Sequence, residues 1–371
     1  MSMNKIAIVH DWLVTNAGAE KVLKEIISLY PNADIYSLVE FLNKDEKKEI
    51  LDDKAVRTSF IQKLPFSRKM FRNYLPHFRK AIESFDLSKY DLIISSSWAV
   101  AKGIKKNDKQ LHICYCHTPI RYAWDLYDEY TSNLSGLKKF LVKRTLKKLR
   151  KWDLATVSRV DYFIANSKFV SERIQRTYGR ESTVIYPPID IKKFTQYNNK
   201  EDFYLTASRL VSYKKTKLIV KSFVKMPDKK LVVIGAGEEY KEIRKIAKKS
   251  PNIKILGFCN DKILIETMQK AKAFIYAAIE DFGIVPIEAI ACGTPVIALN
   301  DGGTAETVID EVNGIHFNSQ SVSDIVSAVK RFETMNFDSK NISTNVQVYS
   351  KERFKREIND FVLRKVNKSK E

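Results

Sequence analysis

Two carboxylates, Glu280 and Glu288, stand eight residues apart and bracket a glycine-containing loop in the second half of the chain. The apolar residues 273–276 precede the loop and predict a buried strand. Pro286 suits a first helical turn, and Gly293 predicts the end of that helix. A helix start directs free backbone N–H groups at one spot, which suits an anion. Carboxylates beside it can accept hydrogen bonds from sugar hydroxyls, so the stretch suits a phosphate together with a sugar.

Two cations follow a second predicted strand. Residues 203–207 are mostly apolar, and Arg209 and Lys214 come soon after them. Arg offers a planar fork and Lys a compact point charge. Two such cations at the end of one strand can clamp a diphosphate.

A histidine ends a third predicted strand, residues 111–116. His117 opens the segment His-Thr-Pro-Ile-Arg-Tyr-Ala-Trp-Asp, residues 117–125. The residue types around His117 allow more than one interpretation. One is a metal site built from His112, Cys114, Cys116 and His117. On a strand the first three share one face and His117 points away, and the spacing is not that of a zinc finger. The other alternative is that His117 is a satisfied loop histidine.

The charge balance indicates an anionic partner. The chain has 371 residues, which predicts two domains because one core rarely grows that large. Lys and Arg number 64 against 44 Asp and Glu, so the net charge is +20. Such an excess suits nucleic acid, an anionic lipid surface or a phosphorylated substrate.

Two stretches without an acidic residue, 54–82 and 134–152, each carry eight Lys or Arg side chains. In the first, the cations alternate with Phe and Tyr, which suits either nucleic acid or an anionic membrane surface. In the second, Leu137, Leu141 and Trp152 fall mostly on one side of a helical wheel, which predicts an amphipathic basic helix on a membrane. For the first stretch, 54–82, the alternative is a solvated basic face with its aromatic residues in the core.

The chain has four cysteines, which indicates a reducing compartment and no disulfide framework. The first residues do not resemble a signal peptide, and no apolar run approaches the roughly 20 residues that span a bilayer. We therefore expect a cytoplasmic protein that lies peripherally on the inner face of the cell membrane.

The run from Glu280 to Glu288, with Phe282 and Gly283 inside it and Ala-Cys-Gly-Thr-Pro-Val at 291–296 behind it, resembles the donor-site signature of family-four glycosyltransferases. These are retaining enzymes of the GT-B fold that use nucleotide sugars. The Arg209-x4-Lys214 spacing is similar to theirs, and the segment 117–125 resembles their bacterial mannosyltransferase-like branch. The resemblance runs from Ile6 to about Phe332.

The resemblance implies an α/β protein of GT-B architecture, in which two Rossmann-like domains with parallel sheets face each other across a cleft. The alternation of strands and helices independently favours parallel sheets. We expect residues 1–198 to form the acceptor-side domain and residues 199–349 the nucleotide-sugar-binding domain. The amphipathic residues 350–371 are expected to form a helix that packs back on the first domain.

The resemblance also implies roles for the donor-site residues. Arg209 and Lys214 would neutralise charge on the leaving diphosphate. Glu280 would hold the sugar hydroxyls and Glu288 the ribose, and His117 would reach the sugar from the opposite domain. Further donor contacts are implied for the backbone of a loop and for a glycine, namely Phe282, Gly283, Ile284, Val285 and Gly18. The family usually has two glycines near Gly18, and here Ala17 takes the first place.

The implied activity is transfer of a hexose, mannose from GDP-mannose being the expected donor, to a glycolipid or surface-polysaccharide acceptor. The partners are then a nucleotide sugar, a lipid-linked or polysaccharide acceptor and an anionic membrane surface, without nucleic acid. No Asp-x-Asp motif occurs in the sequence, so we expect neither a metal nor another cofactor. A sugar-nucleotide epimerase of the same fold and a basic nucleic-acid-binding protein stay open as alternatives.

Overall fold

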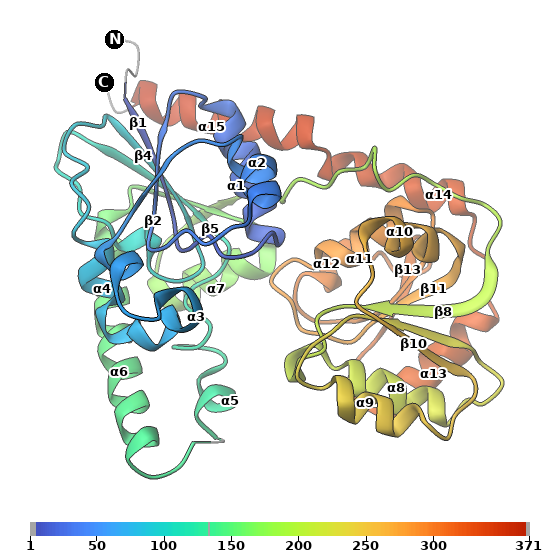
Figure 1. Cartoon of the computed structure of the whole chain (residues 1–371). Helices are drawn as coiled ribbons and strands as arrows, with labels where there is room; N and C mark the ends of the chain where they lie inside the picture. The colour runs from blue at the N-terminus through green and yellow to red at the C-terminus, as the bar shows by residue number, and fades with distance from the viewer. Residues whose placement is uncertain (1–4, 133, 369–371) are drawn as a thin grey trace. The chain divides into compact units, whose positions relative to one another are not determined.

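The computed structural model describes residues 5–132 and 134–368 and divides the chain into two compact units (Figure 1). The first unit runs to Pro188 and resumes at Phe354, and the second unit is Ile189–Arg353. Each unit is built on one parallel β-sheet.

The first unit contains a seven-stranded sheet with the order β3-β2-β1-β4-β5-β6-β7, and every described pairing in it is parallel. Its strands are β1 (Ile6–His10), β2 (Asp34–Ser37), β3 (Val56–Thr58), β4 (Leu92–Ser97), β5 (Leu111–Cys116), β6 (Tyr162–Ala165) and β7 (Ser182–Val184). Ala7 and Val9 pack into one apolar cluster and Ile8 into another. Side chains alternate between the faces of a strand, so both faces of this sheet are covered.

The helices of the first unit cover these two faces. They are α1 (Gly18–Leu29), α2 (Lys44–Leu51), α3 (Ser67–Met70), α4 (Leu75–Ile82), α5 (Tyr127–Ser132), α6 (Gly136–Ala155), α7 (Lys168–Tyr178) and most of α15 (Lys351–Lys368). Leu23 of α1 and Phe361 of α15 belong to the cluster of Ile8, whereas Phe78 of α4 and Leu149 of α6 belong to the other. The last helix of the chain therefore packs on the same face as the first.

The second unit contains a six-stranded parallel sheet with the order β10-β9-β8-β11-β12-β13. Its strands are β8 (Glu201–Ala207), β9 (Leu231–Ile234), β10 (Ile253–Gly257), β11 (Ala271–Tyr276), β12 (Val296–Leu299) and β13 (Gly314–Phe317). Its helices are α8 (Thr216–Val224), α9 (Tyr240–Ala247), α10 (Asp261–Lys270), α11 (Ile284–Ala291), α12 (Thr304–Thr307), α13 (Val322–Glu333) and α14 (Ser339–Thr344).

In both sheets the first strand of the unit lies beside the fourth, β1 beside β4 and β8 beside β11. The chain thus winds outward in one direction from the first strand and later returns to start in the other direction. This strand order defines a doubly wound fold, and ligands of such folds bind outside the carboxyl ends of the two strands at the reversal. The prediction of two Rossmann-like parallel sheets is confirmed.

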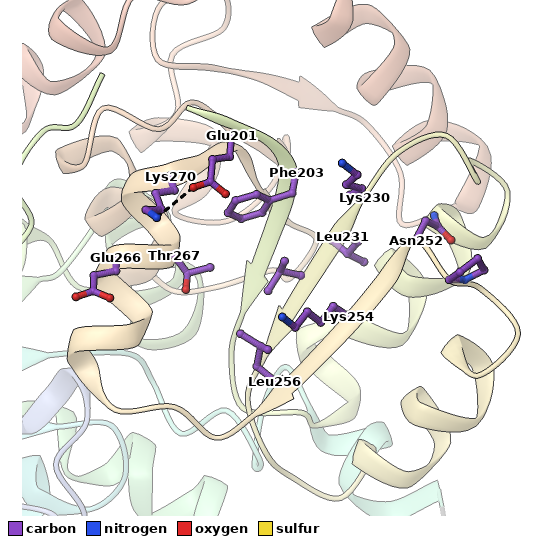
Figure 2. Close-up of a pocket in the computed structure, with 12 residues that line it drawn as sticks. Glu201, Phe203, Lys230, Leu231, Asn252, Lys254, Leu256, Glu266, Thr267 and Lys270 are labelled. Atoms are coloured by element: carbon purple, nitrogen blue, oxygen red, sulfur yellow. Dashed lines mark ion pairs between the residues drawn. The ribbon is translucent and has the colours of Figure 1, made fainter. Parts of the chain in front are cut away.

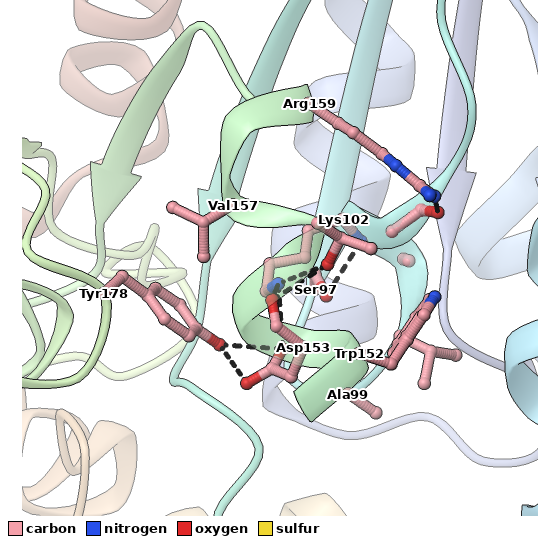
Figure 3. A network of polar contacts seen from close by, with 12 residues as sticks. Ser97, Ala99, Lys102, Trp152, Asp153, Val157, Arg159 and Tyr178 are labelled. Carbon is pink, nitrogen blue, oxygen red and sulfur yellow. Dashed lines mark hydrogen bonds and ion pairs between the residues drawn. The ribbon is translucent and has the colours of Figure 1, made fainter. Parts of the chain in front are cut away.

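A buried ion pair fastens α6 to the sheet of the first unit (Figure 3). Lys102 lies in the 3-10 turn η3 (Ala101–Gly103) that follows β4, and its Nζ is 2.8 Å from Oδ1 of Asp153 in α6. Lys102 also donates to Thr156 Oγ1, and the hydroxyl of Tyr178 donates to both oxygens of Asp153. Because Lys102 and Asp153 are both fully buried, each charge depends on its partner.

We predict that Lys102→Met lowers the free energy of unfolding of the first unit by about 3–5 kcal/mol, because it leaves the Asp153 carboxylate buried without its cation. The matched control is Lys192→Met, which removes the exposed ion pair with Glu352 and should cost less than about 1 kcal/mol. Calorimetry of both variants measures the difference. Equal costs would contradict the prediction.

Candidate functional site

In the second unit, an ion pair joins the carboxyl ends of β8 and β11. Lys214 Nζ lies 2.5 Å from Glu280 Oε1 and donates to the Tyr276 hydroxyl at 3.2 Å. Burial pulls the pKa of Lys214 down, but Glu280 and the two tyrosines Tyr276 and Tyr213 outweigh it, so the pKa lies above its ordinary value. Lys214 therefore provides a permanent positive charge at the reversal of this sheet.

Arg209 is connected to this pair through Tyr213. The Arg209 guanidinium is exposed and donates to the Tyr213 hydroxyl at 2.8 Å. The Tyr213 ring centroid is 5.4 Å from Lys214 Nζ. The two predicted cations thus lie on one short segment after β8, one partly buried and one in solvent.

The loop after Glu280 leads into α11 with backbone groups rather than with a capping side chain. Gly283 is the N-cap, at a positive φ of 86°, and among the described residues no side chain caps this helix. Phe282 is buried, while Ile284 and Val285 are half-buried. The first-turn N–H groups of α11 and its positive dipole end therefore follow closely after Glu280, the partner of Lys214, and such a helix start favours an anion.

A second loop, residues 300–303 after β12, supports the first. The Gly303 N–H donates to the Glu280 carbonyl at 2.7 Å. A Cβ on Gly303 would lie 2.3 Å from Phe282 Cα, and one on Gly302 would lie 2.5 Å from the Glu280 carbonyl oxygen. Only glycine allows the two backbones to come this close, and their contact holds Glu280 in place.

Glu288 lies in α11, and the structure places it differently from Glu280. The Glu288 residue is only 4% exposed, whereas the Glu280 side chain is 16% exposed. The two carboxylates that bracket the loop therefore differ in their access to solvent.

In the first unit, His117 follows β5 and is buried. Its Nε2 lies 2.8 Å from Ser96 Oγ at the end of β4, and Ser96 Oγ lies 3.1 Å from His10 Nδ1 at the end of β1. Burial lowers the pKa of His117 to about 3, and the nearby His10 acts in the same direction. His117 is therefore a neutral imidazole at physiological pH and can serve as a hydrogen-bonding group but not as a cation.

Gly18 is the first residue of α1 and is half-buried. Two residues later Glu20 accepts the Ala17 N–H at 3.1 Å and lies 3.9 Å from His10 Nε2. Gly18 thus starts the helix that carries Glu20 to the His10–Ser96–His117 chain.

The predicted residues form two clusters, one in each unit. Arg209, Lys214 and Glu280 belong to the second unit, and His117 and Gly18 to the first. Sequence reasoning missed their polar neighbours His10, Ser96, Glu20, Tyr213 and Tyr276. A usable signal was the rule that carboxyl ends of parallel strands meet at one edge, because His10, Ser96 and Tyr276 all lie at or near such ends.

A hollow of the second unit lies elsewhere. It has a volume of about 490 Å³ and is lined by residues of β8, β9, β10 and α10, among them Glu201, Phe203, Lys254 and Glu266 (Figure 2). Glu201 and Phe203 come from the amino-terminal half of β8, so this hollow is remote in the sheet from Arg209 and Glu280. A smaller hollow of about 310 Å³ is lined by Ser212, three lysines of the segment 215–221, Leu218, Glu239 and Gln320.

The alternative metal site receives no support from the geometry. His112 uses both ring nitrogens for hydrogen bonds, to Ser95 Oγ at 2.8 Å and to the Arg159 carbonyl at 2.9 Å. Within residues 5–132 and 134–368, no group of three or more His, Cys, Asp or Glu side chains is arranged to hold a metal ion.

Two family descriptions match the chain, one in each half. Residues 18–193 match "Glycosyltransferase Family 4", and residues 189–349 match "Glycosyl transferases group 1". Together with the doubly wound sheets, these matches define a two-domain enzyme fold of the GT-B class. The chain belongs to the glycosyltransferases that combine these two domains.

The chain is similar to relatives that are named mannosyltransferases. It is 27% identical over 253 residues to the alpha-1,3/1,6-mannosyltransferase ALG2 of Saccharomyces cerevisiae, covering 54% of this chain and 48% of the relative. It is 29% identical over 180 residues to the GDP-mannose-dependent monoacylated alpha-(1-6)-phosphatidylinositol monomannoside mannosyltransferase of Corynebacterium glutamicum, covering 41% and 47%. The matches thus span about half the length of these relatives.

Solved structures share the fold over nearly the whole chain. Anabaena Alr3699/HepE in complex with UDP and glucose aligns with a TM-score of 0.70 at 17% identity, covering 96% of this chain and 98% of that one. Sucrose-phosphate synthase from Thermosynechococcus elongatus aligns with a TM-score of 0.72 at 15% identity, covering 98% and 99%. At these identities the likeness concerns the fold.

We predict that Gly303→Ala destabilises the second unit by about 1–3 kcal/mol, the usual cost of overpacking. Gly303 has a helical φ of −64°, where alanine by itself would stabilise the protein by about 0.4–1 kcal/mol. The clash with the Phe282 backbone should reverse that sign. Urea unfolding of the variant measures whether its stability falls or rises. A gain in stability would show that alanine at position 303 does not clash with the Phe282 backbone.

Proposed function

We propose that the protein is a retaining hexosyltransferase that takes mannose from GDP-mannose and transfers it to a lipid-linked or polysaccharide acceptor. The observation that carries the proposal is the Lys214–Glu280 pair at the reversal of the second sheet, beside the start of α11. The names of the relatives support mannose and GDP-mannose. A thermal-shift screen with GDP, UDP and their sugars tests the donor, and stabilisation by uridine nucleotides alone would argue against GDP-mannose.

In this proposal the second unit neutralises the leaving diphosphate. The Lys214 ammonium has three N–H donors and directs them at Glu280 and Tyr276 as well as toward a phosphate oxygen. Arg209, exposed on the same segment, adds a bidentate donor, and the N–H groups of residues 282–285 add the dipole of α11. Each group favours the charge that develops on the leaving oxygen and so stabilises the transition state.

Glu280 is proposed to orient the hexose. One carboxylate oxygen holds Lys214, and the other accepts hydrogen bonds from sugar hydroxyls. Glu288 is proposed to accept from the ribose hydroxyls, and Gly18 to let the backbone approach the donor phosphate. His117 contributes a neutral hydrogen-bonding nitrogen to the sugar.

Retention follows if the acceptor attacks from the side on which the nucleotide leaves. The acceptor hydroxyl oxygen forms the bond to the anomeric carbon, and the bond from that carbon to the phosphate oxygen breaks. The acceptor proton passes to the leaving phosphate oxygen, so no protein base is required. This route suits a cluster whose carboxylate, Glu280, is already held by the Lys214 ammonium.

We predict that Glu280→Ala and Arg209→Ala each lower kcat/KM. The loss should correspond to about 2–4 kcal/mol of transition-state stabilisation, as removal of one preorganised group does. Neither should unfold the protein, because both residues follow strand ends rather than fill the core. The matched controls are Glu266→Ala, in the larger hollow, and Arg244→Ala, exposed on α9. Transfer assays with purified variants test this, and near-normal rates for either site variant would remove that residue from the site.

Activity is predicted to persist in EDTA. Lys214 and Arg209 supply the positive charge that a metal ion supplies in other diphosphate sites. The measurement is the transfer rate before and after dialysis against EDTA, with added Mg²⁺ and Mn²⁺ as controls. A strict requirement for either ion would refute the metal-free proposal.

We further propose that the first unit lies on an anionic membrane surface through α6. Leu137, Phe140 and Leu141 in its first turns are 74%, 59% and 51% exposed, and Arg144 and Lys148 continue the same stripe at helical spacing. Figure 1 shows this end of α6 extending away from the sheet, with α5 beside it. Trp152, predicted to share one apolar side of this helix with Leu137 and Leu141, is instead buried in the core together with Leu149. Among the described residues, no helix is both long and apolar enough to cross a bilayer.

We predict that the double reversal Arg144→Glu with Lys148→Glu weakens binding to phosphatidylglycerol vesicles at least tenfold, because each cation near such a surface contributes about 1 kcal/mol. The control with the same change in net charge is Lys241→Glu with Lys245→Glu, exposed on α9 of the second unit. Co-sedimentation measures both. Equal losses would assign the effect to net charge, and preference of the parent for DNA over vesicles would favour the nucleic-acid alternative.

The epimerase alternative differs from transfer in one observable. An epimerase converts the donor alone, whereas a transferase needs an acceptor. Incubation of the protein with donor and no acceptor, followed by separation of the sugars, distinguishes them, and an epimeric nucleotide sugar would overturn the proposed transfer.

A further inference from the structure

Three strands of the first sheet bring two histidines and a serine into one buried chain. His10 and Ser96 are direct register partners in the β1–β4 pair, so their side chains point to the same face. His117 follows β5 directly, and its backbone N–H donates to the Ser97 carbonyl at 2.8 Å. His10 and Ser96 are fully buried and His117 is 8% exposed, so water does not compete strongly for these hydrogen bonds.

Ser96 couples the protonation patterns of the two imidazoles. Its Oγ lies between His10 Nδ1 at 3.1 Å and His117 Nε2 at 2.8 Å. A hydroxyl has one hydrogen to donate and lone pairs to accept. When it donates to one ring, it is left to accept from the other, so one ring nitrogen is bare and the other carries a hydrogen. The tautomer of His10 therefore dictates that of His117.

Glu20 sets the direction of this chain. Its carboxylate lies in the first turn of α1, where the helix dipole favours negative charge, and one oxygen is 3.9 Å from His10 Nε2. A hydrogen on Nε2 faces that carboxylate favourably, whereas a lone pair would be repelled by it. The neighbouring carboxylate of Asp11 accepts the backbone N–H groups of residues 98–101. Glu20 is thus the carboxylate at ion-pair distance from His10.

We propose that Ser96, His10 and Glu20 are positioning residues that hold His117 as its Nε2–H tautomer, so that Nδ1 accepts the hydrogen of a hexose hydroxyl. The order is His10 Nε2–H toward Glu20, Ser96 O–H to His10 Nδ1, and His117 Nε2–H to Ser96 Oγ. The inference about the hexose depends on the proposed function, whereas the tautomer does not. In this tautomer His117 accepts, through Nδ1, a hydrogen bond that a sugar hydroxyl donates.

The adjacent residue of the same strand offers a matched control. Ser95 Oγ lies 2.8 Å from His112 Nε2, in a buried Ser–His hydrogen bond of the same length as that of Ser96 with His117. His112 Nδ1 faces the Arg159 carbonyl, so Nδ1 carries the hydrogen and Nε2 accepts from Ser95. The two neighbouring serines therefore hold histidines of opposite tautomer.

The tautomers can be measured on the unliganded protein by NMR of ¹⁵N-labelled imidazoles. We expect His117 to be protonated at Nε2 and His112 at Nδ1 in the parent at pH 8. Ser96→Ala and Glu20→Gln should each convert His117 to a mixture of tautomers, while Ser95→Ala should leave it unchanged. A parent His117 protonated at Nδ1, or an unchanged His117 in Ser96→Ala, would overturn the proposal whatever the protein's substrate is.

Kinetics test the link to the hexose. Ser96→Ala and Ser95→Ala should lower the melting temperature similarly, because each removes one buried serine–histidine bond. Only Ser96→Ala should lower kcat/KM, by about tenfold or more, as misplacement of a contact group does. Ser96→Thr, which keeps the hydroxyl, should recover both the tautomer and the rate. Equal rates for the two alanine variants would overturn the contact with the sugar, and failure of every nucleotide sugar to bind would overturn the proposed function while leaving the tautomer result to stand.

Discussion

The reversal of winding between the first and fourth strands of each sheet is the constraint on which the chemistry depends. Right-handed crossovers place the helices before and after the reversal on opposite faces, so the loops at that point leave in opposite directions. In the second unit these loops carry Lys214 and Glu280. In the first unit His10 ends β1, and Ser96 is the last residue but one of β4. Polar groups can gather at both points because ligands of doubly wound folds bind outside the strand ends at the reversal, away from the apolar layers on the faces of the sheet.

The two clusters differ in electrostatic character. The second unit keeps a cation, because Glu280 and two tyrosines hold the pKa of Lys214 above its ordinary value in spite of burial. The first unit keeps neutral imidazoles, because burial and a second histidine lower the pKa of His117 to about 3. Charge suits a diphosphate, and directed hydrogen bonds suit hydroxyls. A nucleotide sugar contains both kinds of group.

The fold class could be predicted from the sequence, and individual elements only in part. The strands with runs of four or more apolar residues, such as β1 and β9, were recognisable from that pattern. The short strands β2, β3 and β13 were not, because polar residues or a glycine leave them without a run of four apolar residues, and their pairing depends on neighbours in space. The stripe on α6 was partly misassigned, because Leu149 and Trp152 meet the sheet whereas Leu137 and Phe140 do not.

The sequence by itself determined the parallel α/β character, the positive charge and the residue types at the ends of β8 and β11, because these depend on local patterns and composition. Only the tertiary structure decided which of those residues touch. Lys214 meets Glu280 across 66 positions of sequence because β8 and β11 are neighbours in the sheet. Ser96 lies between His10 and His117 because β4 is hydrogen-bonded to both β1 and β5. Contacts of this kind follow from strand order, which no local pattern of residues encodes.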